Sequence, residues 1–168
     1  ARIAERADID AVLHLGDYLY EYSAEGYASE RAEELGRVVE PANELLSLAD
    51  YRTRYAQYRR DEDLQAAHAA HPFIIVWDDH EVANDSWRDG AENHDPGTEG
   101  SFVERRMAAL QAWHEWLPVR PPVSMNDIIY RRFQYGDLLD LLMLDTRIIG
   151  RDLQYTYSDF VNGGIIDV

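Results

Sequence analysis

Three short apolar segments of this sequence each end at an aspartate. They are residues 9–15 (IDAVLHL), closed by Gly16-Asp17; residues 73–77 (FIIVW), closed by Asp78-Asp79; and residues 138–144 (LLDLLML), closed by Asp145. Short apolar runs that stop at turn-forming or charged residues predict buried strands. Because ligands of open α/β sheets lie beyond the carboxyl ends of the strands, the three acidic ends are predicted to converge on one site.

Three helices are predicted from capping residues and from apolar side chains at helical spacing. The first covers residues 47–60, the second residues 61–70 before Pro72, and the third begins at residue 101 and ends at the prolines of 118–122. Ser47 with Asp50, and Ser101 with Glu104, have the spacing of a helix-capping box. Both serines are therefore expected to cap a helix through their side chains.

Aromatic and histidine side chains divide between predicted core and predicted surface. The aromatic residues expected to pack in the core are Tyr51, Tyr55, Tyr58, Trp113 and Trp116. His14 alternates with two leucines and is expected to be a hydrogen-bonded core histidine. His68 and His71 lie near a helix end, where exposure or capping is expected.

A β-hairpin is predicted in the last third of the sequence. Residues 128–134 are strand-like, residues 135–137 can turn, and residues 138–144 form the returning apolar strand, expected to be buried.

Strands and helices together indicate a mixed α/β (α+β) fold. The length of 168 residues, 46% of them hydrophobic, suits one domain or part of a larger one.

The charge of the chain excludes several classes of function. Thirty-two acidic residues against 16 basic ones give a formal net charge of -16, which opposes passive binding to nucleic acid or anionic lipid. Bound metal cations can, however, offset a cluster of carboxylates. All the basic residues are arginines and cysteine is absent, so lysine Schiff-base, P-loop and thiolate chemistry are excluded within this segment. No apolar run approaches the ~20 residues that span a bilayer, and no export signal lies within the chain.

Residues after the first two apolar segments combine several kinds of metal ligand. A two-metal phosphoesterase site needs a bridging carboxylate, further Asp, Asn or His ligands, and a group that stabilises the leaving oxygen. The candidates for such a centre are Asp17, Tyr20, Asp79, His80 and Asn84. Carboxylate and amide oxygens suit calcium, and imidazole and phenolate suit iron or zinc.

Each of these features also has a purely structural interpretation. Gly16-Asp17 can be only a turn, in which the glycine supplies a positive φ. Residues 78–81 can be a solvated acidic loop, although four ionisable groups beside a buried segment favour a partnered site. Arg147 can bind a phosphate through two parallel hydrogen bonds or can form a structural ion pair.

The arrangement of these motifs resembles a known enzyme family. The motifs are His14-Leu15-Gly16-Asp17-Tyr18-Leu19-Tyr20-Glu21, Tyr51-Arg52-Thr53-Arg54-Tyr55, His71-Pro72-Phe73, Trp77-Asp78-Asp79-His80-Glu81-Val82-Ala83-Asn84-Asp85 and Leu144-Asp145-Thr146-Arg147. In order and spacing they resemble the PhoD-like alkaline phosphatase D family of the calcineurin-like metallophosphoesterases, from near residue 1 to about residue 151.

The resemblance implies a fold, a reaction and roles for particular residues. It implies a β-sandwich flanked by helices, and hydrolysis of small or polymeric phosphate monoesters and diesters by secreted or periplasmic enzymes that use calcium and iron, with other divalent metals as alternatives. Asp17 would then bridge the metals, Tyr20 would bind iron, and Asp79 and Asn84 would bind calcium. His80 would be the catalytic histidine that assists the leaving oxygen.

The resemblance also implies that Arg147 would offset charge in the transition state. The family has further ligands before residue 1 and beyond residue 168. Residues 1–168 would therefore be a single partial domain that lacks its N- and C-terminal portions and holds about half of the active site, with little activity alone.

Two other functions remain open at this point. A metal-independent glycosidase could use Asp17 and Asp79 as paired carboxylates, but it leaves Tyr20, His80 and Asn84 unexplained. A non-catalytic calcium-binding or interaction module derived from such an enzyme would bind calcium without turnover.

Overall fold

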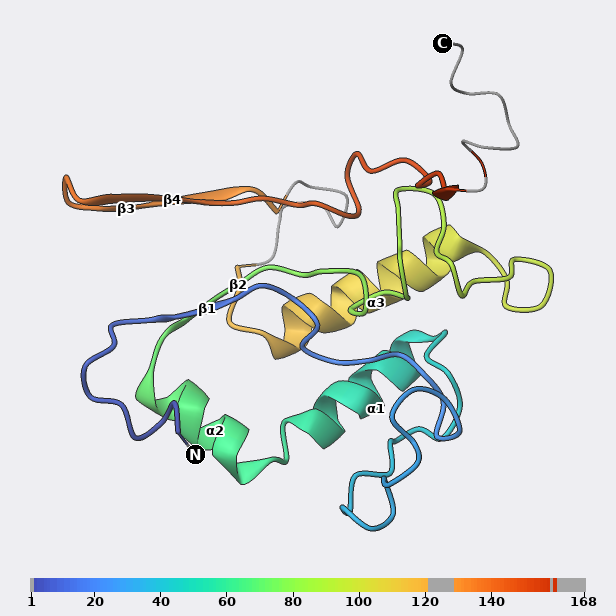
Figure 1. The fold of residues 1–168 in the computed structure, drawn as a ribbon, viewed down its shortest axis with the longest axis horizontal. Coiled ribbons are helices and arrows are strands. Elements are labelled where there is room, and N and C mark those ends of the chain that lie inside the picture. Colours follow the sequence, from blue (N-terminus) through green and yellow to red (C-terminus); the bar gives the residue numbers. More distant parts are fainter. Residues whose placement is uncertain (1, 121–128, 158, 160–168) are drawn as a thin grey trace.

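The computed structural model describes residues 2–120, 129–157 and 159, and it shows a mixed helix and strand fold. The elements, in chain order, are β1 (Val12–His14), α1 (Leu48–Tyr58), α2 (Glu62–Ala70), β2 (Phe73–Ile75), α3 (Phe102–Trp116), β3 (Arg131–Tyr135) and β4 (Leu139–Met143). Helices α1 and α3 lie side by side, and the β3–β4 hairpin extends away from them (Figure 1). None of the helices in these ranges is both long and apolar enough to cross a membrane.

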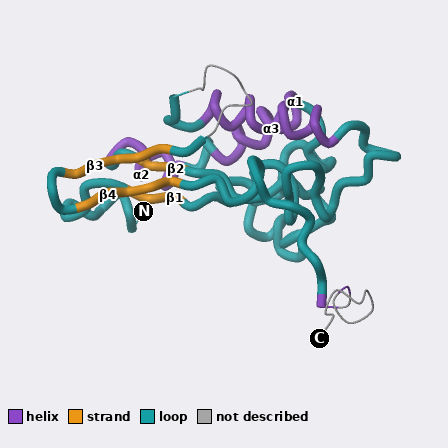
Figure 2. Tube along the Cα trace, turned by 90° about the horizontal axis from the view of Figure 1, so that it is seen from above, coloured by secondary structure: helices purple, strands orange, loops and turns teal. Residues whose placement is uncertain are grey.

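Strands β1 and β2 form a parallel pair that sets the position of the site. Val12 pairs with Phe73 and His14 with Ile75. Figure 2 shows the two strands running next to each other into long loops. Because parallel strands present their carboxyl ends at the same edge, the loops that follow His14 and Ile75 begin beside each other.

The starts of the helices agree with the sequence except in one detail. Ser47 caps α1 with the complete predicted capping box, since its hydroxyl accepts from the N–H of Asp50 and the Asp50 carboxylate accepts from the N–H of Ser47. Asp61 caps α2 through the N–H of Leu64. Ser101 precedes α3 but makes no side-chain capping bond, so the second predicted capping box is wrong.

The core lies between α1, α3 and β2. Tyr51, Tyr55 and Trp113 are fully buried, and Tyr58 and Trp116 pack against them, which confirms the predicted aromatic core. The Trp113 ring meets that of Trp77 edge-on, with the ring centroids 5.0 Å apart. Burial of such large rings supplies much of the hydrophobic stabilisation, so α3 forms without a side-chain cap.

Arg54 ties α1 to the loop of residues 20–41. Its buried guanidinium donates to the backbone carbonyls of Tyr20, Tyr22, Glu40 and Pro41. A buried charge of this kind is stable only when its donors are satisfied, as they are here. The irregular loop that carries Tyr20 is thereby fixed to a helix.

The apolar strands are less buried than predicted. Leu138 is 96% exposed and Leu144 is 57% exposed, so the prediction that residues 138–144 form a buried strand is wrong. Successive side chains of a strand point to opposite faces, and only the face bearing Leu141 and Met143 packs against the described core. In β1, Leu13 is likewise exposed.

His68 on α2 and His71 after it were expected to be exposed or to cap a helix end, and both contact other parts of the chain. The Nε2 atom of His68 lies 2.9 Å from the Tyr18 hydroxyl, and its ring stacks on Phe73 at 3.9 Å between centroids. Burial, followed by the charges of Arg59 and His14, lowers the pKa of His68 to about 4. His71 is the C-cap residue of α2 but is buried, with Nε2 2.9 Å from the carbonyl of Ile3.

Candidate metal centre

The loops after β1 and β2 bring three predicted site residues together. One ligand atom each from Asp17, Asp79 and His80 lies within 4.8 Å of the others. The Oδ1 atom of Asp17 is buried and has no hydrogen-bond partner in the described part of the chain. A buried carboxylate oxygen without a partner is costly, and a bound cation would satisfy it, so this donor set fits a metal ion.

Tyr20 lies next to this cluster and contacts two of its residues. Its hydroxyl donates to Oδ2 of Asp17 across 3.4 Å, and its ring lies 4.2 Å from the ring of His80 between centroids. Burial, followed by the negative charge of Asp17, raises the pKa of Tyr20 to about 12. Without a cation the phenol therefore stays protonated, and a metal ion would be needed to stabilise its phenolate.

The two aspartates after β2 occupy different electrostatic surroundings. Burial raises the pKa of Asp79, which accepts a hydrogen bond from the N–H of Asp85 across 2.5 Å. Burial is also the largest single effect on Asp78 and raises its pKa, but the hydrogen bond and charge of Arg147, with smaller effects of Asp79 and His80, together lower the pKa of Asp78. Asp78 is thus the acid that Arg147 binds most closely, and Asp79 is the acid that contributes to the cluster.

Arg147 is brought to the site by the segment that follows β4. Its Nε and Nη2 atoms donate to the two carboxylate oxygens of Asp78 at 2.6 and 3.1 Å. Asp79 and Asp85 lie 3.4 and 3.3 Å from the same guanidinium. The contacts of Arg147 in this structure are those of a structural ion pair that holds the acidic loop.

Asp145, which follows the third apolar segment, accepts hydrogen bonds from its own loop and is not part of the cluster. Its Oδ1 accepts from the N–H groups of Arg147 and Ile148 at 2.9 and 2.8 Å. Among the described residues, the cluster of ligand atoms contains only Asp17, Asp79 and His80. The third end therefore supplies an arginine to the site instead of the predicted carboxylate.

Asn84 lies on the same loop, and its amide nitrogen is bound to Glu92. Nδ2 donates to Glu92 across 3.0 Å, and the backbone N–H of Asn84 donates to Glu21 across 2.7 Å. The amide oxygen remains as the atom with which Asn84 could bind a cation.

Glu81 joins the two loops and was not among the predicted site residues. Its buried carboxylate accepts from the backbone N–H groups of Asp17, Tyr18 and Asp78 at 3.1, 2.6 and 2.8 Å. Burial raises the pKa of Glu81 to about 7, although the three N–H groups act to lower it. The only sequence signal for this role was the acidic run beside a buried segment.

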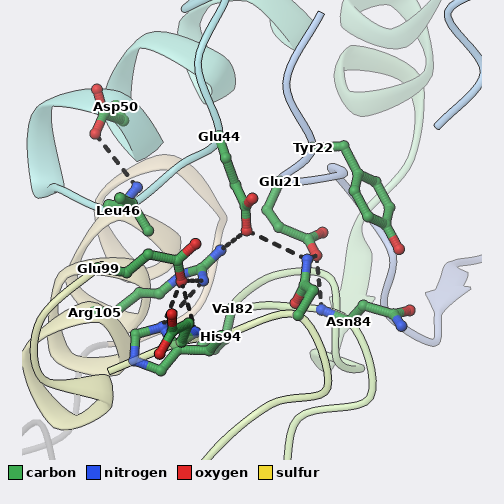
Figure 3. A network of polar contacts seen from close by, with 12 residues as sticks. Glu21, Tyr22, Glu44, Leu46, Asp50, Val82, Asn84, His94, Glu99 and Arg105 are labelled. Atoms are coloured by element: carbon green, nitrogen blue, oxygen red, sulfur yellow. Dashed lines mark hydrogen bonds and ion pairs between the residues drawn. The ribbon is translucent and has the colours of Figure 1, made fainter. Parts of the chain in front are cut away.

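A second polar network lies behind His80, and sequence reasoning missed it. Glu21 is fully buried and contacts His80, while Asn93 donates to both Glu21 and Glu44. Figure 3 shows Glu44 between Arg105 and Glu21. The guanidinium of Arg105 donates to Glu44 across 2.7 Å. No local pattern links these residues, because they come from four separate parts of the sequence.

Comparisons with known proteins agree with the motifs. The family model described as PhoD-like phosphatase matches residues 1–163. Alkaline phosphatase D of Bacillus subtilis (strain 168) is 43% identical over 143 residues, which are 83% of this chain and 24% of that protein. A solved structure described as the structure of PhoD has 41% sequence identity and a TM-score of 0.76, and the match covers 90% of this chain and 28% of that one. The chain thus spans about a quarter of the length of these relatives.

Proposed function

Because the chain belongs to the PhoD-like phosphatase family, we propose that it is part of a metal-dependent phosphoester hydrolase whose centre lies at Asp17, Asp79 and His80. The observation that carries the proposal is the meeting of these three side chains, in which Oδ1 of Asp17 has no hydrogen-bond partner among the described residues. The family membership supports a phosphoesterase, and the donor set supports its dependence on metal.

The proposed centre uses the predicted residues in defined roles. The metal would be held by Asp17, Asp79, the Tyr20 phenolate and the Asn84 amide oxygen, with calcium and iron as the proposed ions and other divalent metals as alternatives. A bound metal would polarise the phosphoryl group and lower the pKa of a water molecule. The substrate class is a small or polymeric phosphoester, and residues 1–168 form part of a single domain of a secreted or periplasmic protein.

His80 and Arg147 act on the substrate in this proposal. In its protonated form, the His80 imidazolium gives the proton on Nε2 to the leaving oxygen and returns to the neutral ring. Arg147, held beside the centre by Asp78, offsets charge on the phosphoryl group in the transition state.

The proposal is tested directly by measuring whether this chain binds metal weakly. Mn²⁺ is added to ¹⁵N-labelled chain, and paramagnetic broadening of amide signals is measured by NMR. We expect selective broadening around Asp17 and Asp79 that EDTA reverses and that Asp17→Asn abolishes. Asp10→Asn, which removes an exposed acid outside the cluster, serves as the matched control and should leave the broadening unchanged.

Hydrolysis of bis(p-nitrophenyl) phosphate is followed in parallel. We expect little turnover by this chain alone and full loss of any turnover in EDTA. Hydrolysis that persists in EDTA, or uniform broadening that Asp17→Asn does not change, contradicts the proposal. A full-length protein could also show selective Mn²⁺ broadening that added Ca²⁺ removes, but no turnover. That result would favour a calcium-binding module instead.

A further inference from the structure

Glu21 is a buried acid whose partners all belong to the proposed centre or its support. Its Oε2 lies 2.8 Å from Nδ1 of His80, and its Oε1 accepts from the backbone N–H of Asn84 at 2.7 Å and from Nδ2 of Asn93 at 2.8 Å. The residue has no exposed surface. A carboxylate in such a position is stable only with donors of this kind, so its orientation is set by these three contacts.

The contact with His80 determines which ring nitrogen carries the proton. A carboxylate accepts hydrogen bonds, so the 2.8 Å contact requires a proton on Nδ1 of His80. In the neutral ring Nε2 then bears the lone pair, and Nε2 makes no hydrogen bond to any described residue. The partner of one ring nitrogen thereby fixes the state and direction of the other.

Aromatic rings restrict the remaining freedom of His80. The rings of Tyr20 and Tyr22 lie 4.2 and 5.6 Å from that of His80 between centroids. Together with the Glu21 contact, they hold the imidazole in one orientation beside Asp17 and Asp79.

Glu21 is in turn held by residues anchored on the helices. Asn93 also lies within hydrogen-bonding distance of Glu44, which pairs with Arg105 on α3 (Figure 3). The Arg105 side chain is 1% exposed and also donates to the Tyr51 hydroxyl on α1 across 3.2 Å. The support of His80 therefore extends through Glu21 to the helical core.

We propose that Glu21 is the positioning residue of this site, which holds His80 as the Nδ1–H tautomer with Nε2 presented to the metal-binding cluster. The role in catalysis rests on the proposed function, but the tautomer and its dependence on Glu21 do not. Glu21 is not one of the residues of the cluster itself, and it acts on the site through His80.

The tautomer is measured by long-range ¹H–¹⁵N NMR of the imidazole rings in metal-free chain containing EDTA, at a pH where His80 is neutral. In the wild-type chain we expect the Nδ1–H form of His80. Glu21→Gln replaces one acceptor oxygen by a donor, and we expect a shift of His80 toward the Nε2–H form. Glu104→Gln is the matched control, because it makes the same substitution at an exposed acid of α3 that lies outside this network, and it should leave the tautomer unchanged.

Three outcomes overturn the proposal: an Nε2–H tautomer in the wild-type chain, an unchanged tautomer in folded Glu21→Gln, or an equal shift in Glu104→Gln. The wild-type result stands even if Glu21→Gln fails to fold. In full-length enzyme that shows turnover, Glu21→Gln should lower kcat about 10- to 100-fold with little change in KM, and Glu104→Gln should change neither. If the chain shows the Nδ1–H form of His80 but binds no metal, the proposed function is rejected and the positioning of His80 by Glu21 still holds.

Discussion

At the scale of single residues, Gly16 allows the two loops of the site to approach each other. Its φ of +107° lies in the region that favours glycine. A Cβ at this position would lie 2.5 Å from the Cβ of Asp78 and 2.7 Å from the carbonyl carbon of Trp77. The loop that carries Asp17 can therefore reach the end of β2 only because no side chain stands between them.

Gly16→Ala is expected to destabilise the chain more than Gly100→Ala. Both positions have positive φ, but a Cβ at Gly100 meets no atom within 4 Å. Gly100→Ala should lower the free energy of unfolding by about 1–2 kcal/mol through backbone strain alone. Gly16→Ala adds a clash with backbone atoms and should lower it further.

Urea denaturation of the two variants measures this difference, and Mn²⁺ broadening reports the geometry of the centre. The broadening should be lost in Gly16→Ala and retained in Gly100→Ala. Equal destabilisation by the two substitutions would show that the loops do not approach as closely as described.

At the scale of elements, local capping and tertiary packing contribute differently to α1 and α3. The start of α1 is fixed by the reciprocal bonds between Ser47 and Asp50. The start of α3 has no such bond, and Phe102 and Arg105 in its first turns are buried instead. One helix start is therefore stabilised locally and the other by its contacts.

Substitution of the two serines separates these contributions. Ser47→Ala should lower the free energy of unfolding by about 1 kcal/mol, because it removes the acceptor for the N–H of Asp50. Ser101→Ala should change it by less than about 0.5 kcal/mol, as is usual for an exposed substitution that removes no specific contact. Chemical denaturation with a common m-value checks both, and a similar loss in the two variants would contradict the assigned caps.

At the scale of the whole molecule, the hairpin and the helical body differ in how they are held. The β3–β4 hairpin extends beyond the helices in Figure 1, and most of its side chains are exposed. Its base is anchored, because Met143 is buried and the Arg131 guanidinium donates to the carbonyl of Ile75. Its tip, at residues 135–139, has no comparable contacts among the described residues.

Hydrogen exchange is expected to follow this division. Amides of α1 and α3 should exchange slowly, those of the hairpin base at intermediate rates, and those near the tip fastest, because local opening exposes few buried contacts there. Exchange measured by mass spectrometry on the isolated chain checks the order. Protection of residues 135–139 equal to that of α3 would mean that another surface covers the hairpin.

Local patterns in the sequence determined the helices, the strand positions, the Ser47 cap and the ligand types after the first two strands. Each depends on residues within a few positions of one another, so it can be recognised without the fold. The motifs also identified the family, which the comparisons confirm over residues 1–163.

Only the tertiary structure decided which polar groups meet and which apolar faces are covered. Glu21 and His80 are 59 positions apart, and Glu81 reaches the N–H of Tyr18 across 63 positions. Such pairs depend on how β1, β2 and the helices pack, and no local pattern encodes them. The exposure of the leucines in residues 138–144 has the same origin, since alternation marks two faces of a strand but the neighbouring elements determine which face is buried.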